Sequence, residues 1–176
     1  MIPFSLLLFF APFVLLKFFE GKGLRESLDF LGFKLGKPFT QLGQGFLLFF
    51  FGFWILIAEG AVLNALGLMD VEKVAEHVLN QPLLVLAFAI VVAPVVEETF
   101  FRGFLQKKTG VVFSSAVFAV LHWGYGSVSE VAAAFTAGLV FGWWVRKNNT
   151  LIPAIAAHAA YNAMSILVIL LGVGGG

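Results

Sequence analysis

The sequence contains no cysteine and little charge. Without cysteine, the chain can form no disulfide, no thiolate nucleophile and no cysteine-ligated zinc site. Charged residues make up 12% of its 176 positions and the net charge is +1, whereas a soluble domain carries roughly a quarter charged residues. Such a chain cannot cover a water-facing surface, and it has no basic excess for a polyanionic partner. Soluble enzymes, disordered tails and nucleic-acid binders are therefore excluded.

Hydrophobic residues are abundant instead. They make up 60% of the chain, and its 22 phenylalanines lie in long apolar runs rather than in the alternation of a lipid-facing barrel strand. A helix that spans a bilayer needs roughly 20 mostly apolar residues. Six segments meet or approach this length, so the sequence predicts an all-α fold, a polytopic transmembrane helical bundle of about six spans. The expected spans are residues 1–19, 42–66, 82–105, 110–123, 128–145 and 151–171.

Basic residues occur in alternate connections between these spans. The second connection contains only Lys73, beside several acidic residues, and the fourth contains no basic residue. Because cytoplasmic loops carry an excess of lysine and arginine, the odd-numbered connections are predicted to be cytoplasmic and both termini to lie outside. The residues that follow this scheme are Lys17, Lys22, Arg25, Lys34, Lys37, Lys107, Lys108, Arg146 and Lys147.

The chain shows no internal repeat, and we divide it where polar residues enter the apolar segments. Residues 1–81 are expected to form N-terminal transmembrane helices and a cytoplasmic connection. Residues 82–171 form a helical core, and residues 172–176 form a glycine-rich tail. The first segment lacks a basic n-region and a convincing cleavage site, so it is expected to be retained. We expect an integral multi-pass protein of the cell membrane.

Three charged residues lie within six positions of the third expected span. Charges at the middle of a bilayer cost a few kcal/mol each and normally face a bundle interior with a partner. Glu98 and Arg102 are four positions apart, on one face of a helix, so they can pair. Glu97 is turned about 100° away and has no partner within the helix. The pattern predicts an ion pair beside an unpaired acid; the alternative is a structural pair and a glutamate without function.

Two later spans carry histidines at helical spacing from a second polar or aromatic side chain. Phe118 and His122 share one face of the fourth span, and His158 and Asn162 share one face of the sixth. A lone membrane histidine more often hydrogen-bonds a neighbouring helix than performs chemistry. Helical rise places Glu97 and His158 roughly 15 and 13 Å from the cytoplasmic ends of their spans, and His122 deeper, at about 21 Å. Together these residues predict one polar site inside the membrane.

These motifs resemble those of the CAAX protease and bacteriocin-processing (CPBP, or ABI) family of intramembrane proteases, which includes the type II CAAX prenyl endopeptidases. The family motifs Glu-Glu-x-x-x-Arg, Phe-x-x-x-His and His-x-x-x-Asn occur here in order on separate apolar segments. The resemblance implies a helical catalytic core at residues 82–171 that encloses a water-accessible cavity. It also implies endopeptidase activity of the CAAX type on a peptide or protein at the membrane. The prenyl endopeptidases have more helices, so dependence on a prenyl group stays open.

The chemistry expected from the resemblance and the residues is hydrolysis by an activated water. Glu97 and His122 would hold and activate the water. His158 and Asn162 would donate to the oxyanion or orient the water, while Glu98 and Arg102 would fix the helix, with Phe118 in support. The family is often described as metalloproteases, and Glu97, His122 and His158 are candidate zinc ligands. Because the same groups suffice for a metal-free glutamate mechanism, no cofactor is expected to be required, and zinc is the alternative.

Other functions stay open. The polar residues could form the buried network of a non-proteolytic binding or immunity scaffold. They could also form a proton relay in a coupled transporter, although the sequence lacks the repeats typical of such proteins. Other protease chemistries find little support, because there is no His-Glu-x-x-His helix and the two aspartates fall outside the expected spans. Ser127 lies in an outer loop and is not expected to be a nucleophile. By the same helical rise, Glu59 and Glu130 lie nearer the outer face, and they are expected to extend to the outer interface.

Overall fold

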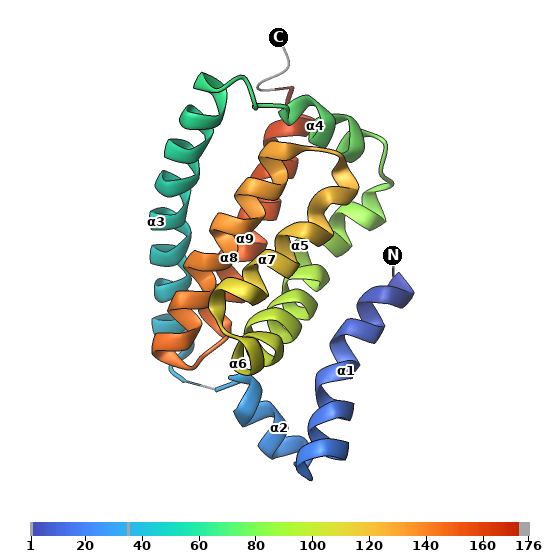
Figure 1. Ribbon diagram of the computed structural model, residues 1–176, viewed down its shortest axis with the longest axis vertical. Helices are drawn as coiled ribbons and strands as arrows, with labels where there is room; N and C mark the ends of the chain where they lie inside the picture. Colours follow the sequence, from blue (N-terminus) through green and yellow to red (C-terminus); the bar gives the residue numbers. More distant parts are fainter. Residues whose placement is uncertain (1, 35, 173–176) are drawn as a thin grey trace.

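The computed structural model describes residues 2–34 and 36–172, and these contain helices and no strand (Figure 1). The predicted all-α fold class is therefore confirmed. In chain order the elements are α1 (Ile2–Glu20), α2 (Leu24–Leu31), α3 (Pro38–Ala65), α4 (Val71–Leu79), α5 (Leu83–Glu98), the π-helical segment η1 (Thr99–Leu105), α6 (Gln106–Thr109), α7 (Val111–Leu121), the 3₁₀ turn η2 (His122–Tyr125), α8 (Val128–Asn148) and α9 (Ile152–Leu170).

Four helical stretches within the described residues are long and apolar enough to cross a membrane. They are α3, the continuous stretch Leu83–Thr109 formed by α5, η1 and α6, α8, and α9. The stretch Val111–Tyr125 is apolar but shorter than these four. α1 occupies the residues of the first expected span. The chain is an integral membrane protein, whereas a total of six spans stays a prediction.

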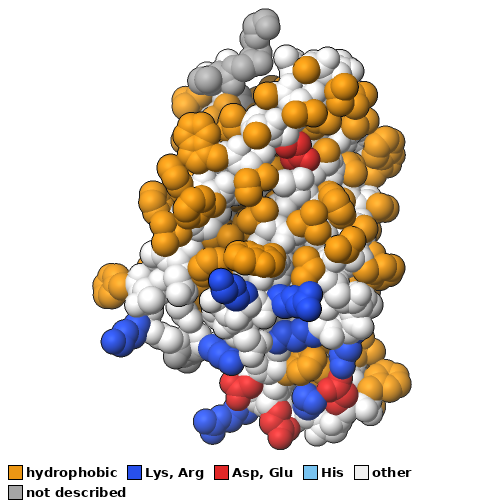
Figure 2. Space-filling view, turned by 60° about the vertical axis from the view of Figure 1, so that its left-hand side comes forward, with side chains coloured by type: hydrophobic (Ala, Val, Ile, Leu, Met, Phe, Trp, Pro, Cys, Tyr) orange, Lys and Arg blue, Asp and Glu red, His pale blue; other side chains and the backbone are white. Residues whose placement is uncertain are grey.

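Lysine and arginine side chains gather at one end of the molecule, below a broad apolar surface (Figure 2). Contacts between distant segments hold this end together. Lys107 on α6 donates to the carbonyl of Phe30 on α2 and to Asn149 Oδ1, 2.8 Å away, just after α8. Lys108 forms an ion pair with Glu20 at the end of α1. One end of the bundle is thus basic, as the alternating connections predicted, and its cytoplasmic orientation stays a prediction.

Glycines on α8 allow it to pack closely against its neighbours. A methyl group at Gly138 would lie 2.8 Å from Ser115 Cβ on α7, and one at Gly142 would lie 2.5 Å from Gln106 Oε1 on α6. Lipid gives helices no hydrophobic drive to associate, so small residues that let backbones approach are a common basis of packing in membranes. The close approach holds α7, and the histidine at its end, against α8.

Asp70 ties the connection after α3 to the connection before α8. Its carboxylate accepts hydrogen bonds from the hydroxyls of Ser127 and Ser129, both at 2.7 Å, and from the backbone N–H groups of Val128 and Ser129, both at 3.0 Å. Lys73 of α4 lies 3.1 Å from the same carboxylate. Burial by itself would raise the pKa of Asp70, but these hydrogen bonds outweigh burial and hold the pKa well below its usual range.

We expect the Asp70→Asn variant to lose a pH-dependent part of the stability. Because the folded-state pKa lies below the unfolded value of about 3.9, ionised Asp70 stabilises the fold above that pH. The contribution disappears as the pH falls below about 4 toward the folded-state pKa. Thermal unfolding in detergent, followed by circular dichroism between about pH 3 and pH 7, measures the effect. Acidification should lower the Tm of the wild type more steeply than that of the variant.

The matched control is Asp29→Asn, which removes an exposed carboxylate on α2. Its unfolding curves should follow those of the wild type at each pH. Parallel pH profiles for the wild type and Asp70→Asn would show that the carboxylate of Asp70 does not stabilise the fold.

Candidate active site

The first motif lies where α5 changes into a π-helix. Glu97 and Glu98 are the last residues of α5, and Arg102 lies within η1. Pro94, one turn earlier in α5, has no backbone N–H to continue the regular hydrogen-bond ladder. π-Helical turns are rare and often occur at functional sites. The irregular backbone is therefore located at the segment that carries the intramembrane charges.

Glu98, Arg102 and His158 form a buried charged cluster. Glu98 is fully buried, and Arg102 and His158 are 1% and 7% exposed. Arg102 Nη1 lies 3.1 Å from Glu98 Oε1, so the predicted pair is present. His158 Nδ1 on α9 lies 2.9 Å from the same oxygen. One carboxylate oxygen thus joins the first and third motifs across two helices.

Aromatic rings complete the surroundings of Arg102. Its guanidinium carbon lies 4.1 Å from the ring centroid of Phe118 and 5.9 Å from that of Phe141, within the range of a cation–π interaction. Among the described residues, Arg102 Nη2 and Glu98 Oε2 have no hydrogen-bond partner. Arg102 is therefore held by attraction to Glu98 and by the two rings rather than by a bidentate fork. Phe118 supports the cluster through this contact, and its ring also contacts that of His122.

Glu97 lies beside the same histidine but is accessible. Its Oε2 atom is 3.7 Å from His158 Nε2, longer than a hydrogen bond. The side chain of Glu97 is 26% exposed, whereas that of Glu98 is 0% exposed. The prediction that Glu97 has no partner within its helix agrees with this geometry, and its neighbour His158 comes from α9. Of the two acids, only Glu97 is accessible to a substrate or a water molecule.

Local partners fix the proton on each imidazole. His158 Nδ1 donates to the Glu98 carboxylate, and His122 Nδ1 donates to the backbone carbonyl of Phe118 at 2.8 Å. The second contact arises because the chain tightens into η2, so the His122 backbone N–H bonds to Ala119 O and leaves the Phe118 carbonyl to the imidazole. In a neutral imidazole, Nε2 is then the acceptor. His122 thus presents a basic nitrogen.

His122 and Asn162 lie around the charged cluster rather than in it. The His122 ring is 4.4 Å from the Phe118 ring, which is 6.0 Å from the His158 ring. Asn162 Nδ2 donates to Ala89 O on α5 at 2.8 Å. The fold therefore brings Glu97 and His158 close together, places His122 one aromatic ring away, and uses Asn162 to join α9 to α5.

Two residues near the site were not recognised in the sequence. Tyr125 stacks against His122 with ring centroids 6.2 Å apart, and its spacing from His122 is the only sequence signal. Glu130, in the first turn of α8, was expected to extend to the outer interface. It lies within electrostatic reach of His122 and His158, while its position relative to the outer interface stays a prediction. The reversal of the chain between η2 and α8 brings Glu130 back to the site, and helical spacing cannot predict such a reversal.

The candidate zinc ligands do not form a metal site in this geometry. In the described part of the chain, no group of three or more histidine, aspartate or glutamate side chains is arranged to hold a metal ion. In both imidazoles Nδ1 is held, by Glu98 in His158 and by the Phe118 carbonyl in His122, and Nε2 stays free, as in histidines that ligate metals. The chemistry of Glu97, His122 and His158 therefore suits zinc, but in the described residues they do not form one group around a metal position.

Comparison with known proteins identifies the family. Residues 79–164, about half of the chain, match the family model described as type II CAAX prenyl endopeptidase Rce1-like. This range includes all three motifs and the charged cluster around Glu98. No curated protein and no solved structure showed significant similarity to the chain. The chain therefore belongs to the Rce1-like type II CAAX prenyl endopeptidase family, within the CAAX proteases.

Proposed function

We propose that this protein is an intramembrane endopeptidase that hydrolyses a peptide bond with a water activated by Glu97 and His122. The observation that carries the proposal is the different setting of two adjacent acids. Glu98 is wholly buried between Arg102 and His158, whereas Glu97 is 26% exposed and lies 3.7 Å from His158 Nε2. A reachable carboxylate next to neutral or cationic imidazoles is suited to general-base catalysis.

In the proposed reaction, Glu97 acts first as the base and then as the acid. Glu97 takes a proton from a water that His122 Nε2 also binds, and the water oxygen attacks the scissile carbonyl carbon. The oxyanion that forms accepts hydrogen bonds from protonated His158 and from the second N–H of the Asn162 amide. The carbon–nitrogen bond then breaks, and Glu97 returns its proton to the leaving amine. Glu98 stabilises the imidazolium of His158 throughout, as a carboxylate beside histidine does in other hydrolases.

The substrate is proposed to be a peptide or protein segment at the membrane, processed in the CAAX manner. Residues 82–171 would form the catalytic core and residues 1–81 the flanking helices, in a cell-membrane protein of six spans with both termini outside.

Full-length protein in neutral detergent should be assayed by mass spectrometry with three peptides. Two end in a CAAX sequence, one farnesylated and one not, and the third is an unrelated apolar peptide.

Products from a CAAX peptide are expected, and they should be absent in both the Glu97→Gln and the His122→Ala variant. Loss in both variants would attribute cleavage to this site rather than to a contaminating protease. The absence of products from every peptide, with monodisperse and folded protein, would reject the proposed activity. Comparing the two CAAX peptides measures the dependence on a prenyl group.

We further propose that hydrolysis requires no metal. Among the described residues no three candidate ligands are gathered around one metal position, and Glu97 cannot easily serve as both ligand and base. After treatment with a chelator, with metal content measured in parallel, turnover should stay within about twofold of the untreated protein. Loss of turnover that added zinc restores would contradict the metal-free mechanism.

A further inference from the structure

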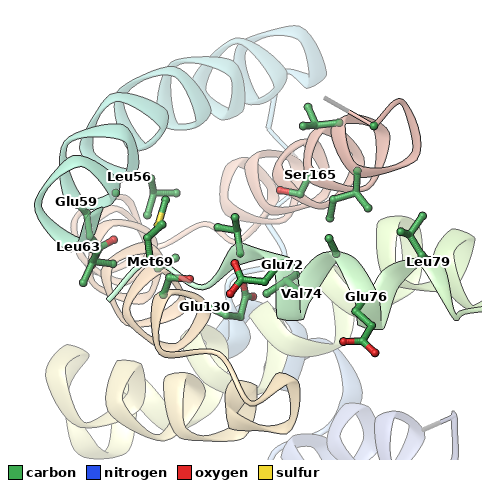
Figure 3. A pocket seen from close by; sticks show the side chains of 18 of the residues that line it. Leu56, Glu59, Leu63, Met69, Glu72, Val74, Glu76, Leu79, Glu130 and Ser165 are labelled. Carbon is green, nitrogen blue, oxygen red and sulfur yellow. The ribbon is translucent and has the colours of Figure 1, made fainter. Parts of the chain in front are cut away.

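A cavity of about 1080 Å³ lies between the end of α3, α4, the start of α8 and the end of α9 (Figure 3). Its volume is at the upper limit of ordinary ligand sites, which enclose about 300–1,000 Å³. No residue of the three motifs lines it, so it is separate from the candidate active site. Most of its wall is apolar, with Leu56, Leu63, Met69, Val74 and Ile169 among the lining residues.

The charged residues of this wall are all acidic. Glu59 comes from α3, Glu130 from α8, and Glu72 and Glu76 from α4. No lysine, arginine or histidine lines the cavity. Glu72 and Glu76 are exposed, so water screens their charges. Glu59 and Glu130 are partly buried and face a mainly apolar space, so their charges act over a longer range.

Glu59 has an acceptor that the protein does not satisfy. The hydroxyl of Thr136 on α8 donates to Glu59 Oε1 at 2.8 Å. Glu59 Oε2 is buried, and no described residue hydrogen-bonds to it. The residue lies on a membrane-spanning helix, where an unsatisfied charged acceptor is costly. Glu59 thus contributes to the cavity wall a carboxylate whose second oxygen lacks a donor.

Glu130 connects the cavity with the catalytic residues. It lines the cavity, and it also lies within electrostatic reach of His122 and His158. The charge of Glu130 therefore acts both on a ligand in the cavity and on the two imidazoles. This arrangement suits a substrate that occupies the active site and the cavity at once. Its scissile bond would lie at Glu97 and a neighbouring segment would lie in the cavity.

We infer that the cavity binds an apolar segment of the peptide substrate that carries one lysine or arginine, whose positive group donates hydrogen bonds to Glu59 and is attracted by Glu130. The apolar wall accommodates the neighbouring side chains. The identification of the ligand as substrate rests on the proposed function, but binding itself requires no hydrolysis.

Binding should be measured in the Glu97→Gln background, in which hydrolysis is not expected. The probes are a fluorescein-labelled leucine-rich peptide with one central lysine and the same peptide with norleucine in its place, in a detergent with neutral headgroups. Fluorescence anisotropy should show at least about tenfold tighter binding of the lysine peptide, since hydrogen bonds to charged groups contribute that much. Adding Glu59→Gln and Glu130→Gln should reduce the preference to about twofold or less.

The matched control is Glu76→Gln, which removes an exposed carboxylate at the same cavity and should leave the preference unchanged within about twofold. Unchanged affinity for the norleucine peptide in every variant shows that the cavity is intact. Equal affinity for the two peptides, or a preference that survives loss of Glu59 and Glu130, would overturn the inference.

A second measurement needs no change at Glu59 or Glu130. Dodecylammonium and dodecyltrimethylammonium carry the same charge, but only the first can donate hydrogen bonds to Glu59. Dodecylammonium should displace the labelled lysine peptide at a several-fold lower concentration. Equal potency would contradict the role of Glu59. Lysine-selective binding by a wild-type protein that cleaves none of the assay peptides would support the cavity site and reject the protease, whereas cleavage of a CAAX peptide together with equal affinity for the two binding probes would do the reverse.

Discussion

Replacing Glu97 with glutamine is expected to lower kcat for peptide cleavage by at least about a hundredfold. The change removes the group that accepts the proton of the water but keeps the size of the side chain and one hydrogen-bond acceptor. Because Glu97 is 26% exposed and has no buried ion pair to lose, the fold should be unaffected. KM should change little, since the proposed role is confined to the transition state.

The measurement is a steady-state comparison of wild type and Glu97→Gln, with thermal unfolding of both proteins as the control for folding. Glu97→Asp is the matched variant, because it keeps the carboxylate but shortens its reach. It should retain more activity than Glu97→Gln. Turnover of Glu97→Gln within about twofold of the wild type would end the assignment of Glu97 as the base. A rise in KM alone would indicate that Glu97 binds substrate rather than activating water.

Local spacing predicted the part of the site that lies on one helix. Glu98 and Arg102 are four residues apart, so their pairing depends only on helical periodicity, and it survives the change from α-helix to π-helix. The role of His158 as a second partner of Glu98 could not be derived in this way. It depends on how α9 packs against α5 and η1, 60 residues away in the chain.

The tertiary contacts of Glu59 could not be predicted from the sequence. Helical rise along its span places Glu59 nearer the outer face, but it does not show which helix lies beside it. In the fold, Thr136 of α8 donates to Glu59, and α4 lies across the end of the bundle beside it (Figure 3). Packing of α4 and α8 against α3 thus makes Glu59 part of the wall of a cavity. No periodicity within α3 contains this information.

Replacing Arg102 with methionine is expected to destabilise the protein by about 3 kcal/mol or more. Methionine has a similar length and suits the contacts with Phe118 and Phe141, so packing is largely kept. The variant leaves Glu98 fully buried, with His158 Nδ1 as its remaining hydrogen-bond donor. Removing one member of a buried ion pair is costly because the other charge stays desolvated. Unfolding in detergent measures the loss.

The double variant Glu98→Gln/Arg102→Met separates this cause from a loss of packing. It removes both buried charges, so it should be more stable than Arg102→Met alone even though it carries an additional substitution. A double variant that is less stable than the single one would mean that Arg102 acts through its aromatic contacts. Recovery of stability without recovery of cleavage would instead show that Glu98 is required to orient His158. The buried pair would then serve catalysis through the imidazole, at a cost in stability that an apolar pair would avoid.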